Sequence, residues 1–141
     1  MNIDKITLAK LLTYAGSIPF VFLTILNLKG TQIIYGADVK QALISYAAII
    51  LSFVAAIHFA YGIMQDQYEK SFLIKSNIIA LAAWLSLLIE FKLAILIILT
   101  GFIITTFIEI CAFKKAVIPE WFFKLRIRIS IIVIICLSLS L

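Results

Sequence analysis

Residues 93–113 read LAILIILTGFIITTFIEICAF, an apolar run in which Glu109 is the one charged side chain. A second apolar run occupies residues 72–89, and only the segment 90–92, read EFK, separates the two. A transmembrane helix needs about 20 mostly apolar residues. Without an interruption the two runs would form one helix of roughly 42 residues, far longer than a bilayer is thick. The sequence therefore predicts a tight hairpin of two transmembrane helices.

The composition of the whole chain points to lipid as its solvent. Its 141 residues are 65% hydrophobic and the mean hydropathy is +1.19, whereas a soluble domain is about 45–50% apolar. The apolar runs are long, unlike the short alternating segments of a membrane β-barrel. We predict an all-α, polytopic integral membrane bundle of about five transmembrane helices, forming one domain over residues 1–141. The predicted spans are 7–28, 41–64, 72–89, 93–113 and 122–141.

Basic residues are distributed unequally between the two sides of this arrangement. Because cytoplasmic segments carry the excess of Lys and Arg, we expect the N-terminus in the cytoplasm and the C-terminus outside. One side holds Lys5, Lys10, Lys70, Lys75, Lys114, Lys115, Lys124, Arg126 and Arg128, and the other holds Lys29, Lys40 and Lys92.

Motifs for catalysis or cofactor binding are missing from the sequence. Cys111 and Cys136 form no CxxC, and His58 is the single histidine, so neither a zinc site nor bis-histidine haem ligation is expected. We find no phosphate loop, Ser/His/Asp set or carboxylate pair. No basic face interleaved with aromatics suggests nucleic acid. We expect no cofactor, no metal and no enzymatic activity.

Two local features carry expectations of their own. Pro19 lies inside the first run and should kink that helix and free a backbone carbonyl. Cys111 and Cys136 should differ in depth by about 15 Å at 1.5 Å per residue. A disulfide needs Cα atoms within about 7 Å, so both thiols should be free.

Polar side chains gather at one depth near the predicted cytoplasmic face. At 1.5 Å per residue, they lie about 6–9 Å inward from the ends of their helices, and each of the five helices contributes. We take this layer as the candidate functional site. Its members are Tyr14, His58, Asn77, Glu109, Arg126 and Arg128.

Helical phase places two of these groups inside the bundle. His58 shares a face with Ala55 and Gly62, and Glu109 shares one with Gly101 and Thr105; such small-residue faces are where membrane helices approach closely. One interpretation is a proton-handling or ligand site built from His58 and Glu109, with Arg126 or Arg128 of the span 122–141 taking part. Ionisable groups within a membrane are functional candidates. The other is that His58 is a packing residue and that Glu109 and the arginines snorkel to the interface.

Six segments are notable in their order and spacing: 14–20 (YAGSIPF), 46–53 (YAAIILSF), 57–59 (IHF), 83–84 (AW), 119–122 (PEWF) and 125–128 (LRIR). Together they resemble a family of bacterial membrane proteins of unknown function that also contains the mitochondrial transmembrane protein 69. The resemblance implies a multi-pass protein of the bacterial inner (plasma) membrane, or of the mitochondrial inner membrane in a eukaryote, with no established activity. The family commonly has His-Trp-Gly in its second helix where this chain has His58-Phe59-Ala60, so the tryptophan is not kept.

Three functions compete on this basis. The first is a non-enzymatic scaffold or accessory subunit of a membrane-protein complex, favoured by the small-residue stripes that serve helix association. The second is a small carrier or proton-coupled transporter, working as a homo-oligomer through the His58 and Glu109 layer. A membrane enzyme acting on a lipid or quinone ranks last because no nucleophile or metal set is recognisable. The lipid bilayer is the partner common to all three.

Overall fold

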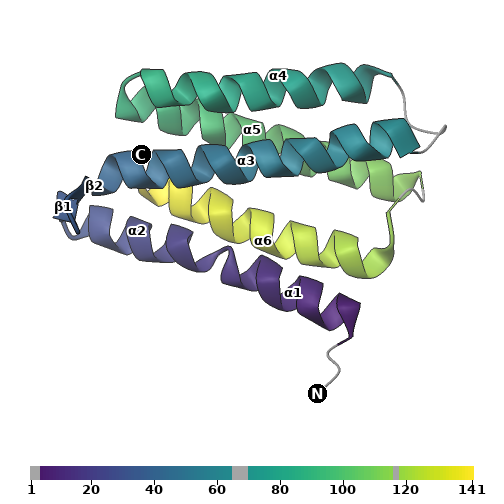
Figure 1. Ribbon diagram of the computed structural model, residues 1–141, viewed down its shortest axis with the longest axis horizontal. Helices are drawn as coiled ribbons and strands as arrows, with labels where there is room; N and C mark the ends of the chain where they lie inside the picture. Colours follow the sequence, from purple (N-terminus) through teal and green to yellow (C-terminus); the bar gives the residue numbers. More distant parts are fainter. Residues whose placement is uncertain (1–3, 65–69, 116–117) are drawn as a thin grey trace.

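The protein is a bundle of long helices, seen in a computed structural model that describes residues 4–64, 70–115 and 118–141 (Figure 1). The all-α class predicted from the sequence is confirmed. Helix α3 runs through the middle, packed against α2, α4 and α5, and α6 closes the bundle against α5 and α2. The elements are α1 (Lys5–Ala15), α2 (Ile18–Leu28), β1 (Ile33–Ile34), β2 (Ala37–Asp38), α3 (Val39–Met64), α4 (Ser71–Leu85), the 3-10 helix η1 (Ser86–Leu88), α5 (Phe91–Lys114) and α6 (Glu120–Leu139).

Within the described residues, four helical stretches are long and apolar enough to cross a membrane. They are Lys5–Leu28, Val39–Met64, Ser71–Leu88 and Phe91–Lys114. The fifth predicted span, α6, has 20 residues but carries three basic side chains in its first half. Many large apolar side chains face outward from the bundle, Phe53 and Phe107 with 66% of their surface exposed. Such a surface suits hydrocarbon and would be unusual on a monomer in water.

The turn between α4 and α5 is tighter than the sequence indicates. Ile89 and Glu90 are extended, with ψ of 171° and 145°, and α5 already begins at Phe91. Phe91 and Lys92, expected in the turn, are therefore helical. The 3-10 turn Ser86–Leu88 tightens the end of α4, as often happens where a helix finishes.

The kink expected at Pro19 is present, and a backbone carbonyl at the kink has a hydrogen-bond partner on a neighbouring helix. The first span breaks between α1 and α2, with Pro19 in the first turn of α2, where the missing N–H of proline does no harm. The Gly16 carbonyl at the break accepts a hydrogen bond from the Tyr46 hydroxyl of α3 at 2.8 Å. A side chain of the neighbouring helix thus satisfies a backbone group freed by the kink.

A small β-hairpin precedes α3, and the apolar pattern does not predict it. Ile33–Ile34 pairs antiparallel with Ala37–Asp38. Tyr35 and Gly36 at its turn have φ of 48° and 81°, the two positive values of a type I′ turn, which glycine favours. The Asp38 carboxylate accepts the Gln41 N–H at 2.8 Å and so caps the start of α3.

Small residues let α3 approach its neighbours closely. A Cβ on Gly101 would lie 2.5 Å from a Leu51 methyl, and one on Gly62 would lie 2.7 Å from a Leu73 methyl. Ala48 and Ala55 are also buried. The small-residue stripes that favoured an external partner are thus used for packing within the chain, which removes that argument for a scaffold. The two cysteines are free, as predicted.

Tyr46→Phe tests whether the Tyr46 hydroxyl stabilises the kinked backbone. Removing the hydroxyl leaves the Gly16 carbonyl without this donor, and we expect a loss of about 1 kcal/mol in the free energy of unfolding, a typical value for one hydrogen bond. Reversible unfolding in micelles measures it. Tyr14→Phe is the matched control, since Tyr14 is exposed and its loss should be near zero. Equal losses in the two variants would contradict the assignment.

Candidate functional site

Three of the predicted polar residues meet in the interior of the bundle. His58 comes from α3, Glu109 from α5 and Arg126 from α6, with 2%, 2% and 7% of their surfaces exposed. Each lies five or six residues, about 8–9 Å, from the end of its helix at the same end of the bundle. Each also belongs to the buried face of its helix, so all three side chains point inward.

The Glu109 carboxylate is the centre of this cluster. One of its oxygens, Oε1, accepts a hydrogen bond from Arg126 Nε at 2.7 Å, and His58 Nε2 lies 3.7 Å from the same oxygen. The short contact is a charge-assisted hydrogen bond, whereas the histidine contact is too long to be one. Glu109 and Arg126 therefore form the ion pair, and His58 lies against it.

Several buried polar atoms of the cluster have no hydrogen-bond partner among the described residues. They are both ring nitrogens of His58, Oε2 of Glu109 and Nη2 of Arg126. Buried polar atoms without a partner are costly, and native proteins hold few of them.

The expectation that Glu109 and Arg126 snorkel to the interface does not hold, because both side chains are enclosed and paired.

The other three candidates are not brought into the cluster. Arg128 lies two residues after Arg126, about 200° around α6, and is exposed. Asn77 follows the buried Ser76 and is exposed, with its Nδ2 donating to the Leu73 carbonyl at 2.9 Å. Tyr14 lies on α1, which has no buried residue. These three side chains lie at a depth similar to that of the cluster, but they point to other sides of their helices and so do not reach it.

Apolar side chains close the bundle on the far side of the cluster. On α5 the positions beyond Thr105 are occupied by Phe102, Ile98 and Ile95, with 2%, 0% and 0% of their surfaces exposed. Leu51 of α3 and Val133 of α6 are as deeply buried. These residues fill the core for about 10 Å along α5 between Ile95 and Phe102. Among the described residues, the buried polar groups on this side are hydroxyls such as Thr24, Ser130 and Ser140, and no charged side chain is buried there.

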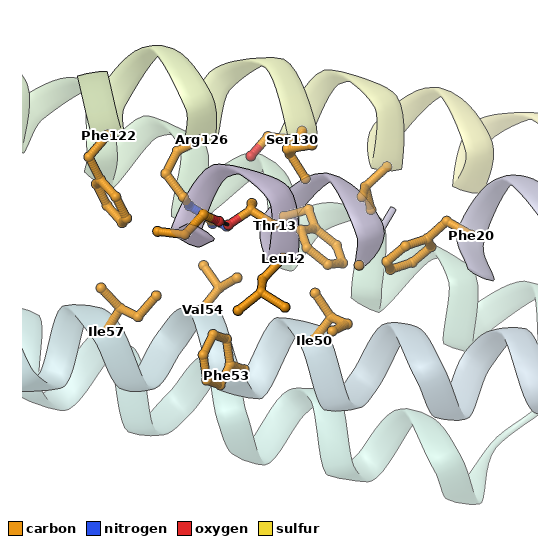
Figure 2. A pocket seen from close by; sticks show the side chains of 15 residues that line it. Leu12, Thr13, Phe20, Ile50, Phe53, Val54, Ile57, Phe122, Arg126 and Ser130 are labelled. Carbon is orange, nitrogen blue, oxygen red and sulfur yellow. Dashed lines mark hydrogen bonds between the residues drawn. The ribbon is translucent and has the colours of Figure 1, made fainter. Parts of the chain in front are cut away.

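An apolar pocket of about 430 Å³ reaches the cluster from the side (Figure 2). Leu12 and Thr13 of α1, Phe53 and Val54 of α3 and several residues of α6 line it. Arg126 descends from α6 among these side chains in Figure 2. The volume lies within the range of small-molecule pockets, and Arg126 is the one charged residue in the lining.

A second hollow, between α3 and α4, faces outward. This α3–α4 groove of about 220 Å³ is lined by Ser52, Ala55, Ala56, Phe59, Ser76, Asn77 and Ala80. Sequence analysis singled out Asn77 by its depth but missed the groove. The available signal was the row of small and polar residues Ser52, Ala56 and Ala60 along one face of an otherwise apolar helix.

The described residues contain no group of three or more His, Cys, Asp or Glu able to hold a metal ion.

In comparisons with known proteins, the family described as "Protein of unknown function (DUF3429)" matches residues 6–141. No curated protein and no solved structure matches. The expected resemblance to an uncharacterised family is confirmed in this form, and the link to the mitochondrial transmembrane protein 69 stays a prediction.

A double-mutant cycle measures the ion pair. Removing one partner of a buried pair leaves the other charge uncompensated, so Glu109→Leu and Arg126→Met should each be strongly destabilising, and the double variant should cost less than their sum. We expect a coupling energy of about 3 kcal/mol. The cycle of Glu109→Ala with His58→Ala should also be non-additive, but by less, because that contact is 3.7 Å long.

The exposed pair of Glu120 and Lys124 is the matched control. Its atoms are 2.6 Å apart but the side chains are 67% and 63% exposed, so its coupling should be far smaller. If the losses in the free energy of unfolding of Glu109→Leu and Arg126→Met simply add in the double variant, the two side chains are not coupled and the ion pair does not stabilise the bundle.

Proposed function

Since the chain belongs to this DUF3429 family of unknown function, its role has to be argued from its own geometry, and we propose that it is a non-enzymatic accessory subunit of a membrane-protein complex. The proposed location is the bacterial inner membrane, or the mitochondrial inner membrane in a eukaryote. The apolar helices that are long enough to cross a membrane support a membrane protein.

The observation that carries the proposal is the α3–α4 groove. In a membrane its opening faces lipid, yet Ser52, Ser76 and Asn77 line it. Ser76 Oγ and Asn77 Nδ2 donate to the Leu73 carbonyl of their own helix at 2.8 and 2.9 Å, but hydrocarbon offers no partner to the amide oxygen and the second amide hydrogen of Asn77. A transmembrane helix of another subunit does offer one, and it packs closely where the surface residues are small. Ala56 and Ala80 supply that small surface. The proposed occupant is therefore a transmembrane helix of a partner protein.

The interior supports the same role. The paired Glu109 and Arg126 join α5 to α6, and the apolar layer of Leu51, Ile98 and Phe102 backs the cluster. A carrier that moves protons or polar solutes needs polar groups on both sides of its site. A bundle whose buried charged groups end at this apolar layer fits a structural subunit better.

A small oligomeric carrier is the second candidate, and the contact of His58 with Glu109 favours it. In that case several copies would assemble, and their His58 and Glu109 layers would handle protons. The two candidates differ in what fills the groove: a foreign helix for the accessory subunit, and a second copy of this chain for the carrier.

Site-specific photo-crosslinking tests the groove. A photo-reactive residue at the exposed Ala56 should crosslink to one partner that co-purifies in fixed stoichiometry in gentle detergent. Asn77→Leu should lower the yield about fivefold, because an interhelical hydrogen bond is worth about 1 kcal/mol. Thr100→Val is the control, since Thr100 is also exposed and bonds its own helix carbonyl, Leu96 O, at 2.8 Å, but on α5.

Crosslinks only between copies of this chain would reject the accessory subunit in favour of the carrier. An unchanged yield with Asn77→Leu would remove the groove from the interface.

Cysteine labelling tests the orientation, with the N-terminus proposed inside. In a chain without Cys111 and Cys136, Tyr35→Cys in the hairpin should react with an impermeant maleimide added to intact cells. Lys114→Cys at the end of α5 should react only after lysis, because the excess of basic residues lies on its side. The reverse pattern would invert the topology.

A further inference from the structure

A pocket of mixed charge and aromatic character lies between α1 and α6, distinct from the apolar pocket beside Arg126. This basic pocket, of about 370 Å³, is lined by Lys10, Tyr14, Glu120, Trp121, Lys124, Leu125 and Arg128. Lys10 and Tyr14 are four residues apart and share one face of α1. The apolar pocket uses other positions of the same two helices, including Thr13 and Arg126. Tyr14 and Arg128, which do not belong to the buried cluster, thus line the basic pocket.

The basic pocket has a surplus of positive charge. Lys10, Lys124 and Arg128 face a single carboxylate, that of Glu120, which is already paired with Lys124 at 2.6 Å. Among the residues that the structure describes, Lys10 and Arg128 therefore remain as cations of the lining without an ion-pair partner. Two free cations favour a ligand that carries net negative charge, and they repel the ammonium of a zwitterionic lipid headgroup.

Its donors match a phosphate. Lysine supplies ammonium donors and arginine a planar fork that binds phosphate oxygens in pairs, and the Trp and Tyr side chains can add an N–H and an O–H. Tryptophan and tyrosine prefer the headgroup level of a membrane. The pocket lies at the first turns of α6, with the exposed apolar Leu11 next to Lys10 on α1. Within the lining, Leu125 and the Trp121 ring supply apolar surface beside the cations.

We propose that the basic pocket binds the phosphate headgroup of an anionic phospholipid in the cytoplasmic leaflet. Basic pockets between transmembrane helices on that side are suited to anionic headgroups. The inference depends on the proposed membrane location and orientation but not on the accessory role. A free phosphate would offer the same oxygens without the hydrocarbon, and the experiment separates the two sources.

Fluorescence quenching by brominated lipid provides the test. Trp84→Phe leaves Trp121 as the single tryptophan, inside the pocket. The protein is reconstituted in vesicles of neutral phosphatidylcholine, in which either brominated phosphatidylglycerol or brominated phosphatidylcholine is present at equal mole fraction. We expect the anionic lipid to quench Trp121 with about tenfold tighter apparent binding, since each nearby cation favours anionic lipid. Inorganic phosphate in the buffer should not reverse it.

Matched variants locate the effect. Lys10→Gln with Arg128→Gln should abolish the preference for the anionic lipid. Lys29→Gln with Lys92→Gln removes the same charge near the opposite end of the bundle and should leave the preference intact. The reciprocal reporter, Trp121→Phe, leaves only the exposed Trp84 of α4 and should show no preference.

Each other outcome overturns the proposal in a different way. Equal quenching by the two lipids, or a preference that survives Lys10→Gln with Arg128→Gln, rejects the pocket. Loss of preference in both double variants shows diffuse charge attraction without a site, and reversal by inorganic phosphate shows a free-anion site. If neither brominated lipid quenches either tryptophan, the membrane location itself fails, and this inference fails with it.

Discussion

The ion pair between Glu109 and Arg126 is the interaction on which the interior depends. A charge buried in a low-dielectric bundle is costly unless a partner compensates it, and the 2.7 Å contact supplies that partner. The pair fixes the azimuth of α5 and α6 relative to each other, because both side chains must face inward at the same depth. His58 lies on the same oxygen, so α3 joins the arrangement.

Close packing around α3 carries the rest of the fold. Gly101 admits the Leu51 side chain, and Phe20 of α2 lies edge-on to both Tyr46 and Phe102, with ring centroids 5.0 and 6.1 Å apart. These contacts, together with the hydrogen bond from Tyr46 to Gly16, hold the kinked first span against the bundle. The kink turns α1 away from α3 (Figure 1), and the two pockets along α1 and α6 lie beside this less enclosed helix.

The surface carries two regions of different chemistry, for which we propose different partners. The α3–α4 groove offers small and hydroxyl or amide groups to another helix, whereas the basic pocket offers cations and aromatic rings to a headgroup. The two belong to different helix pairs, so a partner helix and a bound lipid need not compete. Both features are compatible with a small subunit that is held in a complex by lipid as well as by protein contacts.

The sequence by itself determined the helical class, the approximate bounds of the long helices and the inward phase of His58 and Glu109, because apolar run length and the 3.6-residue period are local properties. It also determined the break at Pro19, which follows from a missing N–H. Only the tertiary structure decided that Arg126, and not Arg128, meets Glu109, since the choice depends on how α6 is rotated against α5. In the same way, it turned Asn77 outward beside Ser52 and used the small-residue stripes inside the chain. Such pairings join residues from different helices, and no local pattern specifies them because packing between distant segments sets the azimuth of each helix.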